Sequence, residues 1–122
     1  MIPKFRAWNT FHNKWVKHFY ITENGLIYNM EQPHRDLIGA VPIENSGLIV
    51  MQSTGVVDIN GQEIFEGDIV RMHSGELLPV KLHHGLFEPV CYYTSRAFGR
   101  VGNVFENPDL LEHPDFREAN ND

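Results

Sequence analysis

The 122-residue sequence has a single cysteine and no long hydrophobic run. Cys91 has no second cysteine with which to form an internal disulfide. No segment reaches the roughly 18 consecutive apolar residues that a transmembrane helix needs. The first residues, Met1 to Arg6, also lack the apolar stretch of a signal peptide. We therefore expect a cytoplasmic protein with no disulfide framework and no membrane partner.

Positive charge is also scarce, with 10 Lys and Arg residues against 16 Asp and Glu residues and a formal net charge of -6. This balance argues against general attraction to nucleic acid, which needs clustered basic residues. Residues 1–22 are different, because they contain basic and aromatic residues and no carboxylate. The aromatic residues could stack on the bases of a single-stranded nucleic acid, and the basic residues could contact its phosphates. We favour a hairpin that buries one aromatic face, because apolar and polar residues alternate there as they do along a strand. The candidate nucleic-acid contacts are Lys4, Arg6, Lys14, Trp15 and Lys17.

Motifs for catalysis and metal binding are absent from the sequence. It contains no Gly-x-Ser-x-Gly elbow, no phosphate-binding glycine loop and no zinc-ligand spacing. His83 and His84 are adjacent, so on a strand they would point to opposite faces and could not share a metal ion. Cys91 lies in an apolar and aromatic run, Val90 to Tyr93, and is predicted to pack in the core. We predict no catalytic residue, no metal site and no cofactor.

Glycine-containing turns between short apolar runs are the strongest positive signal. Asn60-Gly61 separates two such runs and predicts a two-residue type I′ hairpin, and Asn24-Gly25 repeats the pattern. Glu66-Gly67-Asp68 marks the start of a further strand. The carboxylates here could bind a cation or catalyse, but we favour turns in which Asp58, Glu66 and Asp68 accept backbone N–H groups.

These signals predict a mainly β fold (β-rich α+β). The expected strands are residues 3–8, 15–21, 26–30, 47–51, 55–59, 62–65, 68–73, 77–83, 87–94 and 100–105. We predict an N-terminal β-meander subdomain with a connecting loop (1–46), a small SH3-like β-barrel subdomain (47–111) and a polar, frayed C-terminal tail (112–122). Asn107 and Pro108 suit the N-cap and first position of a short helical turn through Leu111.

Three blocks of sequence resemble the YopX-like family of phage and prophage proteins. They are residues 4–8 (KFRAW), residues 54–70 from Thr-Gly through Asn-Gly to Glu-Gly-Asp-Ile-Val, and residues 102–108 (GNVFENP). The resemblance implies a β-rich, phage-associated protein of the bacterial cytoplasm, in a family without an established activity. The residues that carry the motif are Trp8, Thr54, Gly55, Asn60, Gly61, Glu66, Gly67, Asp68, Gly102, Asn103, Asn107 and Pro108.

Three classes of function remain open at this point. We favour a non-enzymatic module that uses strand edges or loops to bind a host or phage protein, or a second copy of itself. Nucleic-acid binding through the N-terminal hairpin is the alternative. An enzyme is the least favoured class, because no catalytic constellation is recognised in the sequence.

Overall fold

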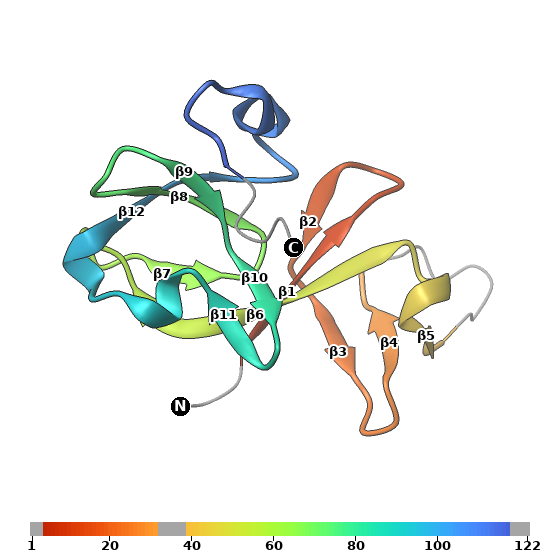
Figure 1. Cartoon of the computed structure of the whole chain (residues 1–122). Coiled ribbons are helices and arrows are strands. Elements are labelled where there is room, and N and C mark those ends of the chain that lie inside the picture. The colour runs from red at the N-terminus through yellow and green to blue at the C-terminus, as the bar shows by residue number, and fades with distance from the viewer. Residues whose placement is uncertain (1–3, 32–38, 118–122) are drawn as a thin grey trace. The chain divides into compact units, whose positions relative to one another are not determined.

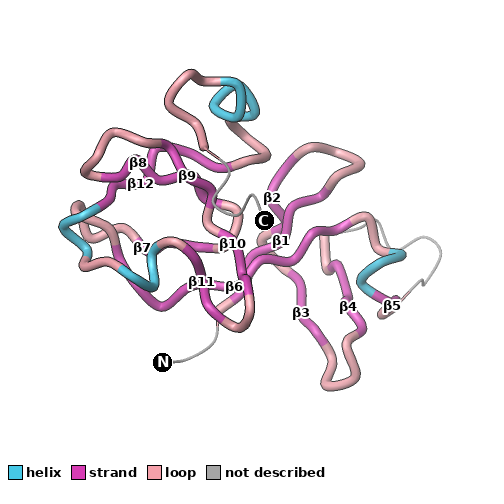
Figure 2. The backbone as a smooth tube through the Cα atoms, in the orientation of Figure 1, coloured by secondary structure: helices cyan, strands magenta, loops and turns pink. Residues whose placement is uncertain are grey.

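The computed structural model describes residues 4–31 and 39–117, which form short β-strands joined by tight turns (Figure 1). All helical segments in these residues are short 3₁₀ turns (Figure 2). None of them is long and apolar enough to cross a membrane. The predicted mainly β fold class is confirmed.

Twelve strands form four sheets in the described residues, with strand orders β2-β1-β6-β7, β3-β4-β5, β12-β8-β9 and β10-β11. The strands are β1 (Phe5–Asn9), β2 (Lys14–Val16), β3 (Phe19–Ile21), β4 (Leu26–Asn29), β5 (Val41–Pro42), β6 (Leu48–Val57), β7 (Glu63–Phe65), β8 (Asp68–Met72), β9 (Leu77–Pro79), β10 (Lys81–His83), β11 (Leu86–Glu88) and β12 (Phe98–Asn103). The 3₁₀ segments are η1 (Ile43–Asn45), η2 (Val90–Tyr92), η3 (Ser95–Ala97) and η4 (Pro108–Glu112).

The chain packs as two compact units. Residues 5–51 make the N-terminal unit, and residues 1–4 with 52–122 make the C-terminal unit. Each has its own buried cluster: Ala7, Val16, Ile27 and Leu48 in the first, and Ile64, Val70, Met72, Val80, Val90 and Phe98 in the second. The subdomain boundaries drawn from the sequence (1–46, 47–111 and 112–122) and the SH3-like label stay predictions. The predicted connection over residues 31–46 lies partly outside the described residues, and its described part contains β5 and η1.

Two strand predictions fail because of contacts that local patterning does not show. Residues 15–21 are two strands instead of one, because Lys17 and His18 both donate backbone N–H groups to Glu31 Oε2, at 2.8 and 3.1 Å. Residues 47–51 and 55–59 belong instead to one long strand, β6. Gly55, at a φ of 81°, lies in a register shift of that strand between Ser53 and Val57, which marks a β-bulge.

Two further predicted strands are divided or shortened. Residues 77–83 form β9 and β10, separated at Val80, whose N–H donates to the Asp68 carbonyl at 2.8 Å. Residues 87–94 keep a strand only at their start, and η2 follows. In η2 only Val90 is buried, so Cys91 is exposed and the prediction that it packs in the core is wrong.

The Asn60-Gly61 turn is in the predicted place but is of a different type. Gly61 has a φ of 78°, whereas Asn60 is not at positive φ. The Gly61 N–H donates to the Asp58 carbonyl (3.0 Å), and the Asp58 N–H donates to the Gln62 carbonyl (2.9 Å). A type I′ turn needs positive φ at both central residues, so the two-residue prediction is wrong for this hairpin. His84 and Gly85, at φ 52° and 82° between β10 and β11, have the type I′ signature instead.

The C-terminal segment is more ordered than the sequence suggests. The helical turn η4 begins at Pro108, as predicted, but the Asn107 side chain does not cap it. The expectation of a frayed tail is wrong for residues 113–117. Leu77 of β9 forms a parallel bridge with Phe116, donates its N–H to the Asp115 carbonyl and accepts the Arg117 N–H, both at 2.9 Å.

Candidate functional site

Asp58 is a buried carboxylate that organises the β6–β7 turn. Only 2% of the surface of this residue is exposed. Oδ1 accepts the N–H groups of Asn60 and Gln62, both at 2.9 Å, and Oδ2 accepts the Arg100 N–H at 2.8 Å. Burial raises the pKa of Asp58, but the three donated N–H groups and the Arg100 charge together lower it below its ordinary value. The predicted role of Asp58 in holding a turn is confirmed.

Asp68 is fully buried at the start of β8. Its Oδ2 accepts the Phe65 N–H at 2.8 Å, and its Oδ1 lies 3.0 Å from Nε of Arg100. Arg100 on β12 therefore contacts both buried acids, one through its backbone and one through its side chain. The two carboxylates of the sequence motif are used to hold backbone and an arginine in place.

The last motif block is a set of turns built by asparagine side chains. Asn103 Oδ1 accepts the N–H groups of Phe105 (2.9 Å) and Glu106 (2.8 Å). Asn107 Oδ1 accepts the Asn103 N–H at 3.1 Å. A Cβ placed on Gly102 would lie 2.4 Å from this oxygen, so the close approach requires glycine.

The remaining motif residues also have structural contacts. Thr54 Oγ1 donates to the Ile64 carbonyl at 2.7 Å, and the backbone N–H groups of Glu66 and Gly67 donate to the carbonyls of Gln52 and Val80, both at 2.9 Å. The buried Trp8 packs edge-on against Trp15, with ring centroids 5.0 Å apart. The motif thus describes how the backbone is folded.

The basic and aromatic residues of the N-terminal stretch are partly engaged with one another. The Arg6 guanidinium lies over the Trp15 ring, 4.6 Å from its centroid, and Trp8 packs on the same indole. Lys14 and Lys17 are exposed. Lys4 belongs to the other unit, where its Nζ lies 3.4 Å from Glu63 Oε1. A hydrogen bond from Ser53 and the Lys4 charge lower the pKa of Glu63, against the effect of burial.

His83 and His84 are stacked, with ring centroids 3.9 Å apart and planes 24° from parallel. The prediction that they point to opposite faces is wrong, because His84 has left the strand and lies in the turn at positive φ. His83 Nδ1 lies 3.3 Å from Glu88 Oε1. In the part of the chain that the structure describes, no three His, Cys, Asp or Glu side chains are grouped as a metal site would need.

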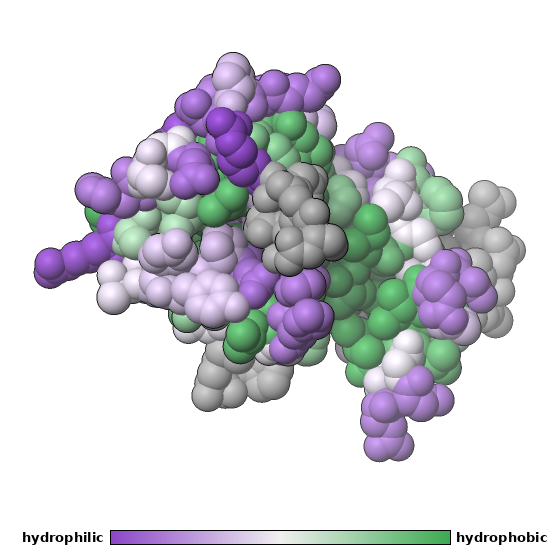
Figure 3. Space-filling view, viewed as in Figure 1, coloured by the Kyte–Doolittle hydropathy of each residue, from purple (hydrophilic) through white to green (hydrophobic). Residues whose placement is uncertain are grey.

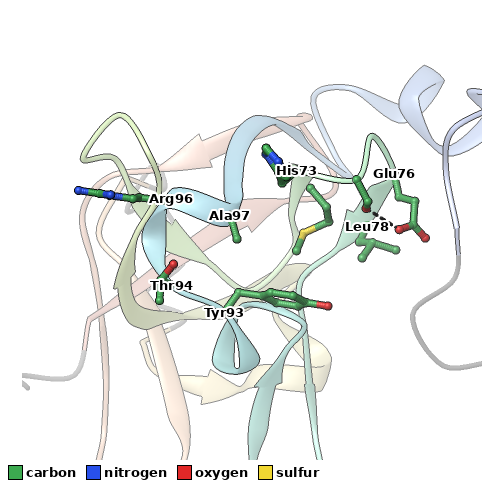
Figure 4. Close-up of a pocket in the computed structure, with 9 residues that line it drawn as sticks. His73, Glu76, Leu78, Tyr93, Thr94, Arg96 and Ala97 are labelled. Atoms are coloured by element: carbon green, nitrogen blue, oxygen red, sulfur yellow. Dashed lines mark hydrogen bonds between the residues drawn. The ribbon is translucent and has the colours of Figure 1, made fainter.

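A surface hollow that the sequence did not predict lies between the β8–β9 turn and the η2–η3 segment (Figure 4). Its volume is about 540 Å³, which is within the size range of ligand pockets. The two walls are joined by the His73 N–H, which donates to the Ala97 carbonyl at 2.7 Å. Met72, Leu78 and Ala97 are the apolar aliphatic residues of the lining, which we call its floor. The Tyr93 ring lies along one side (Figure 4). We call this the tyrosine hollow.

The rim of the tyrosine hollow is polar. Arg96 lies at one end of it, Glu76 accepts a hydrogen bond from Ser74 (2.7 Å) at the other end, and His73 lies between them (Figure 4). Tyr93 is 52% exposed. The neighbouring Tyr92 is 61% exposed, does not line the hollow, and donates its hydroxyl to Glu88 at 2.5 Å, which raises the pKa of Tyr92 to about 12.

A second hollow, of about 340 Å³, shares Met72, His73, Arg96 and Ala97 with the first. It extends along β12 and also contains Arg71, Arg100 and the exposed Ile59. We call it the arginine hollow. The sequence pattern predicts a strand at Tyr93 and gives no signal at Arg96. The two residues come together with the β8–β9 turn only because the 3₁₀ segments reverse the chain.

Comparison with known proteins shows the family and identifies solved structures with a similar fold, among them two crystal structures. The family model described as YopX protein matches residues 4–112. The crystal structure of protein EF1440 from Enterococcus faecalis is 26% identical, with a TM-score of 0.66, covering 91% of this chain and 99% of that chain. The crystal structure of protein yopX from Bacillus subtilis is 20% identical, with a TM-score of 0.58, covering 89% of this chain and 95% of that one. No curated protein matches the sequence.

Proposed function

Since the chain belongs to the YopX protein family, we propose that it is a phage- or prophage-encoded protein of the bacterial cytoplasm that binds another protein and catalyses no reaction. The partner is a host protein, a phage protein or a second copy of the chain. The binding surface is the tyrosine hollow of the C-terminal unit together with its exposed aromatic wall.

The apolar floor of this hollow is the observation that carries the proposal. Leu78 and Ala97 are partly buried residues that pack against the core cluster, and the hollow above them is open to solvent. Tyr93 stands beside them with about half of its surface exposed. Tyrosine next to a small apolar depression is the combination on which binding hot spots are built, because the ring offers area at a low entropic cost.

The polar groups of the C-terminal unit support a binding role over a catalytic one. Asp58, Asp68 and Asn103 are buried and hold backbone groups. A general base or nucleophile needs a neighbouring group and access to substrate. Among the described residues that line the tyrosine hollow, the Glu76 carboxylate accepts a hydrogen bond from Ser74, and the His73 imidazole lies on the rim.

Capture from host cells tests this proposal. N-terminally tagged protein, and its Tyr93→Ala and Tyr92→Ala variants, would be recovered from phage-infected cells, and both proteins and nucleic acids would be identified. We expect wild type and Tyr92→Ala to retain a partner protein that Tyr93→Ala does not. If the partner is a second copy of the chain, sedimentation experiments should show self-association of wild type and Tyr92→Ala but not of Tyr93→Ala. Retention of no protein by any form would contradict the proposal.

Nucleic-acid binding is the second candidate, and one observation favours it. On the β3–β4 hairpin of the N-terminal unit, Tyr20 and Tyr28 are stacked with centroids 5.4 Å apart, and the basic Lys14 and Lys17 are exposed in the same unit. The tip of this hairpin is hydrophilic, and hydrophobic residues border its strands (Figure 3). A Lys14→Gln and Lys17→Gln double variant should weaken binding to labelled oligothymidylate and reduce its salt dependence. No binding by wild type at low salt would dispose of this candidate.

A further inference from the structure

We infer that the tyrosine and arginine hollows together bind an extended acidic peptide segment of a partner protein, with a large apolar side chain next to one or more carboxylates. This inference rests on the proposed binding function and names the chemistry of the partner. The apolar side chain enters the tyrosine hollow, and the carboxylates lie over Arg96 and His73 toward the arginine hollow.

The geometry of the two hollows fits an extended chain. They share Met72, His73, Arg96 and Ala97, so they are continuous across the Arg96 and His73 side chains. One hollow has the apolar floor and the aromatic wall, and the other continues beside β12. Successive side chains of an extended peptide point in opposite directions and recur every second residue on one face. A peptide lying across both hollows therefore offers one side chain to the floor and the next on that face to the basic residues.

The charges select an acidic partner. Arg71, Arg96 and Arg100 all line the arginine hollow, and none of the described residues that line it is Asp or Glu. Arg71 is paired with Asp115 (3.2 Å) and Arg100 with Asp68 (3.0 Å). The exposed Arg96 side chain makes no hydrogen bond or ion pair with any residue that the structure describes. Its guanidinium points outward, away from the other side chains labelled in Figure 4. In this position it can bind a carboxylate with two N–H groups.

The surroundings of these arginines favour a peptide over a nucleic acid. The C-terminal unit contains twelve Asp and Glu residues and six Lys and Arg residues, so its formal charge is -6. The net negative charge of this unit disfavours a polyphosphate backbone, whose binding grows with the number of phosphates neutralised. A short segment with one or two carboxylates needs only the local positive charge, and its apolar side chain gains from the floor of the tyrosine hollow.

Selection from a displayed library of random linear peptides tests the inference. Enriched peptides would be synthesised with a fluorescent label and titrated by fluorescence anisotropy against wild type and four variants. Arg96→Gln is matched by Lys81→Gln, which removes one exposed positive charge outside both hollows. Tyr93→Ala is matched by Tyr92→Ala, its exposed neighbour that lines neither hollow. Thermal melting would verify that each variant is folded.

We expect enriched peptides to carry Asp or Glu close to an aromatic or large aliphatic residue. Arg96→Gln and Tyr93→Ala should each weaken binding by about tenfold, the effect of losing one charge-assisted hydrogen bond or one aromatic anchor. The two matched variants should stay within about twofold of wild type. Enrichment without acidic residues, affinity that Arg96→Gln leaves unchanged, or competition by labelled oligothymidylate would each overturn the inference.

The inference and the proposed function can fail separately. A cellular partner that is lost by Tyr93→Ala but still bound by Arg96→Gln would support the proposed binding function. The same result would contradict the inference that the partner segment is acidic. Acidic peptides that bind at Arg96, together with no protein retained from infected cells, would establish the site and contradict the proposed function.

Discussion

The turns at Thr22–Gly25 in the N-terminal unit and Asp58–Gly61 in the C-terminal unit share two backbone hydrogen bonds and a glycine at positive φ, but different side chains begin them. Thr22 Oγ1 accepts one N–H, from Leu26 at 2.9 Å, near the surface. Asp58 is buried and accepts three. The same backbone turn is thus held by one local side-chain bond in the N-terminal unit. In the C-terminal unit it is held by a buried acid that also bonds to Arg100 on a distant strand.

Charge separates the two units as well. Residues 5–51 contain four acidic and four basic residues, whereas the C-terminal unit holds the whole formal charge of -6. The C-terminal unit also has the larger buried cluster. The C-terminal unit therefore depends on a few buried polar groups, and substitutions of these groups should cost more stability than equivalent substitutions in the N-terminal unit.

Replacing the first residue of each turn should give the largest difference in stability between the two units. Asp58→Ala leaves three backbone N–H groups without their acceptor and should lower the free energy of unfolding by about 3 kcal/mol. Thr22→Ala removes one acceptor in a part-exposed position and should cost about 1 kcal/mol. Urea denaturation followed by circular dichroism measures both. Equal losses for the two variants would show that burial of Asp58 does not set its contribution.

The two turn glycines should, in contrast, respond alike. Gly25 and Gly61 have φ values of 85° and 78°, and an added Cβ would meet no atom within 4 Å at either position. Valine at either site is therefore strained only through its backbone, and each variant should lose about 1 to 2 kcal/mol. Thermal melting compares them. If Gly61→Val alone lost stability, packing in the C-terminal unit and not local strain would be the cause.

Acid should weaken the C-terminal unit through Asp58. Because the folded-state pKa of Asp58 lies below its unfolded value, the carboxylate stabilises the fold fully above the unfolded value, and this contribution is lost as pH falls through the lowered folded value. The stability difference between wild type and Asp58→Asn should therefore shrink below about pH 4. Urea denaturation across that range measures it. A difference that stays constant with pH would contradict this role of the ionised side chain.

Surface histidines should matter least, in both units. His83 contacts Glu88 and His84 at a partly exposed position, and His18 is exposed in the N-terminal unit. His83→Ala and His18→Ala should each change the free energy of unfolding by no more than about 0.5 kcal/mol. Melting curves of the two variants decide this. A large loss for His83→Ala would give the β10–β11 hairpin a structural role that its contacts do not suggest.

The sequence predicts the positions of turns better than their geometry. Glycine marks Asn24-Gly25 and Asn60-Gly61 correctly, since positive φ is a local property. The turn type depends on Asp58, whose third bond goes to Arg100 on a distant strand. The break at Lys17 likewise depends on Glu31, and the exposure of Cys91 depends on a 3₁₀ turn within an apolar run.

The candidate site was less predictable than the fold for the same reason. Strong sequence signals came from residues that hold backbone, such as Asp68 and Asn103. Tyr93 and Arg96 lie in no recognisable motif, and they approach His73 only because the His73 N–H bonds to the Ala97 carbonyl. Contacts of this kind have no local sequence pattern.

The short bridge between Phe116 and Leu77 has a practical consequence for shortened forms of this protein. The family match ends at residue 112, so a truncation guided by that match would remove the residues that satisfy the Leu77 N–H and carbonyl groups. Strand β9 would then present an open edge beside a fully buried leucine. Uncovered edges of this kind promote strand-to-strand aggregation, so the shortened protein should be harder to keep in solution than the full chain.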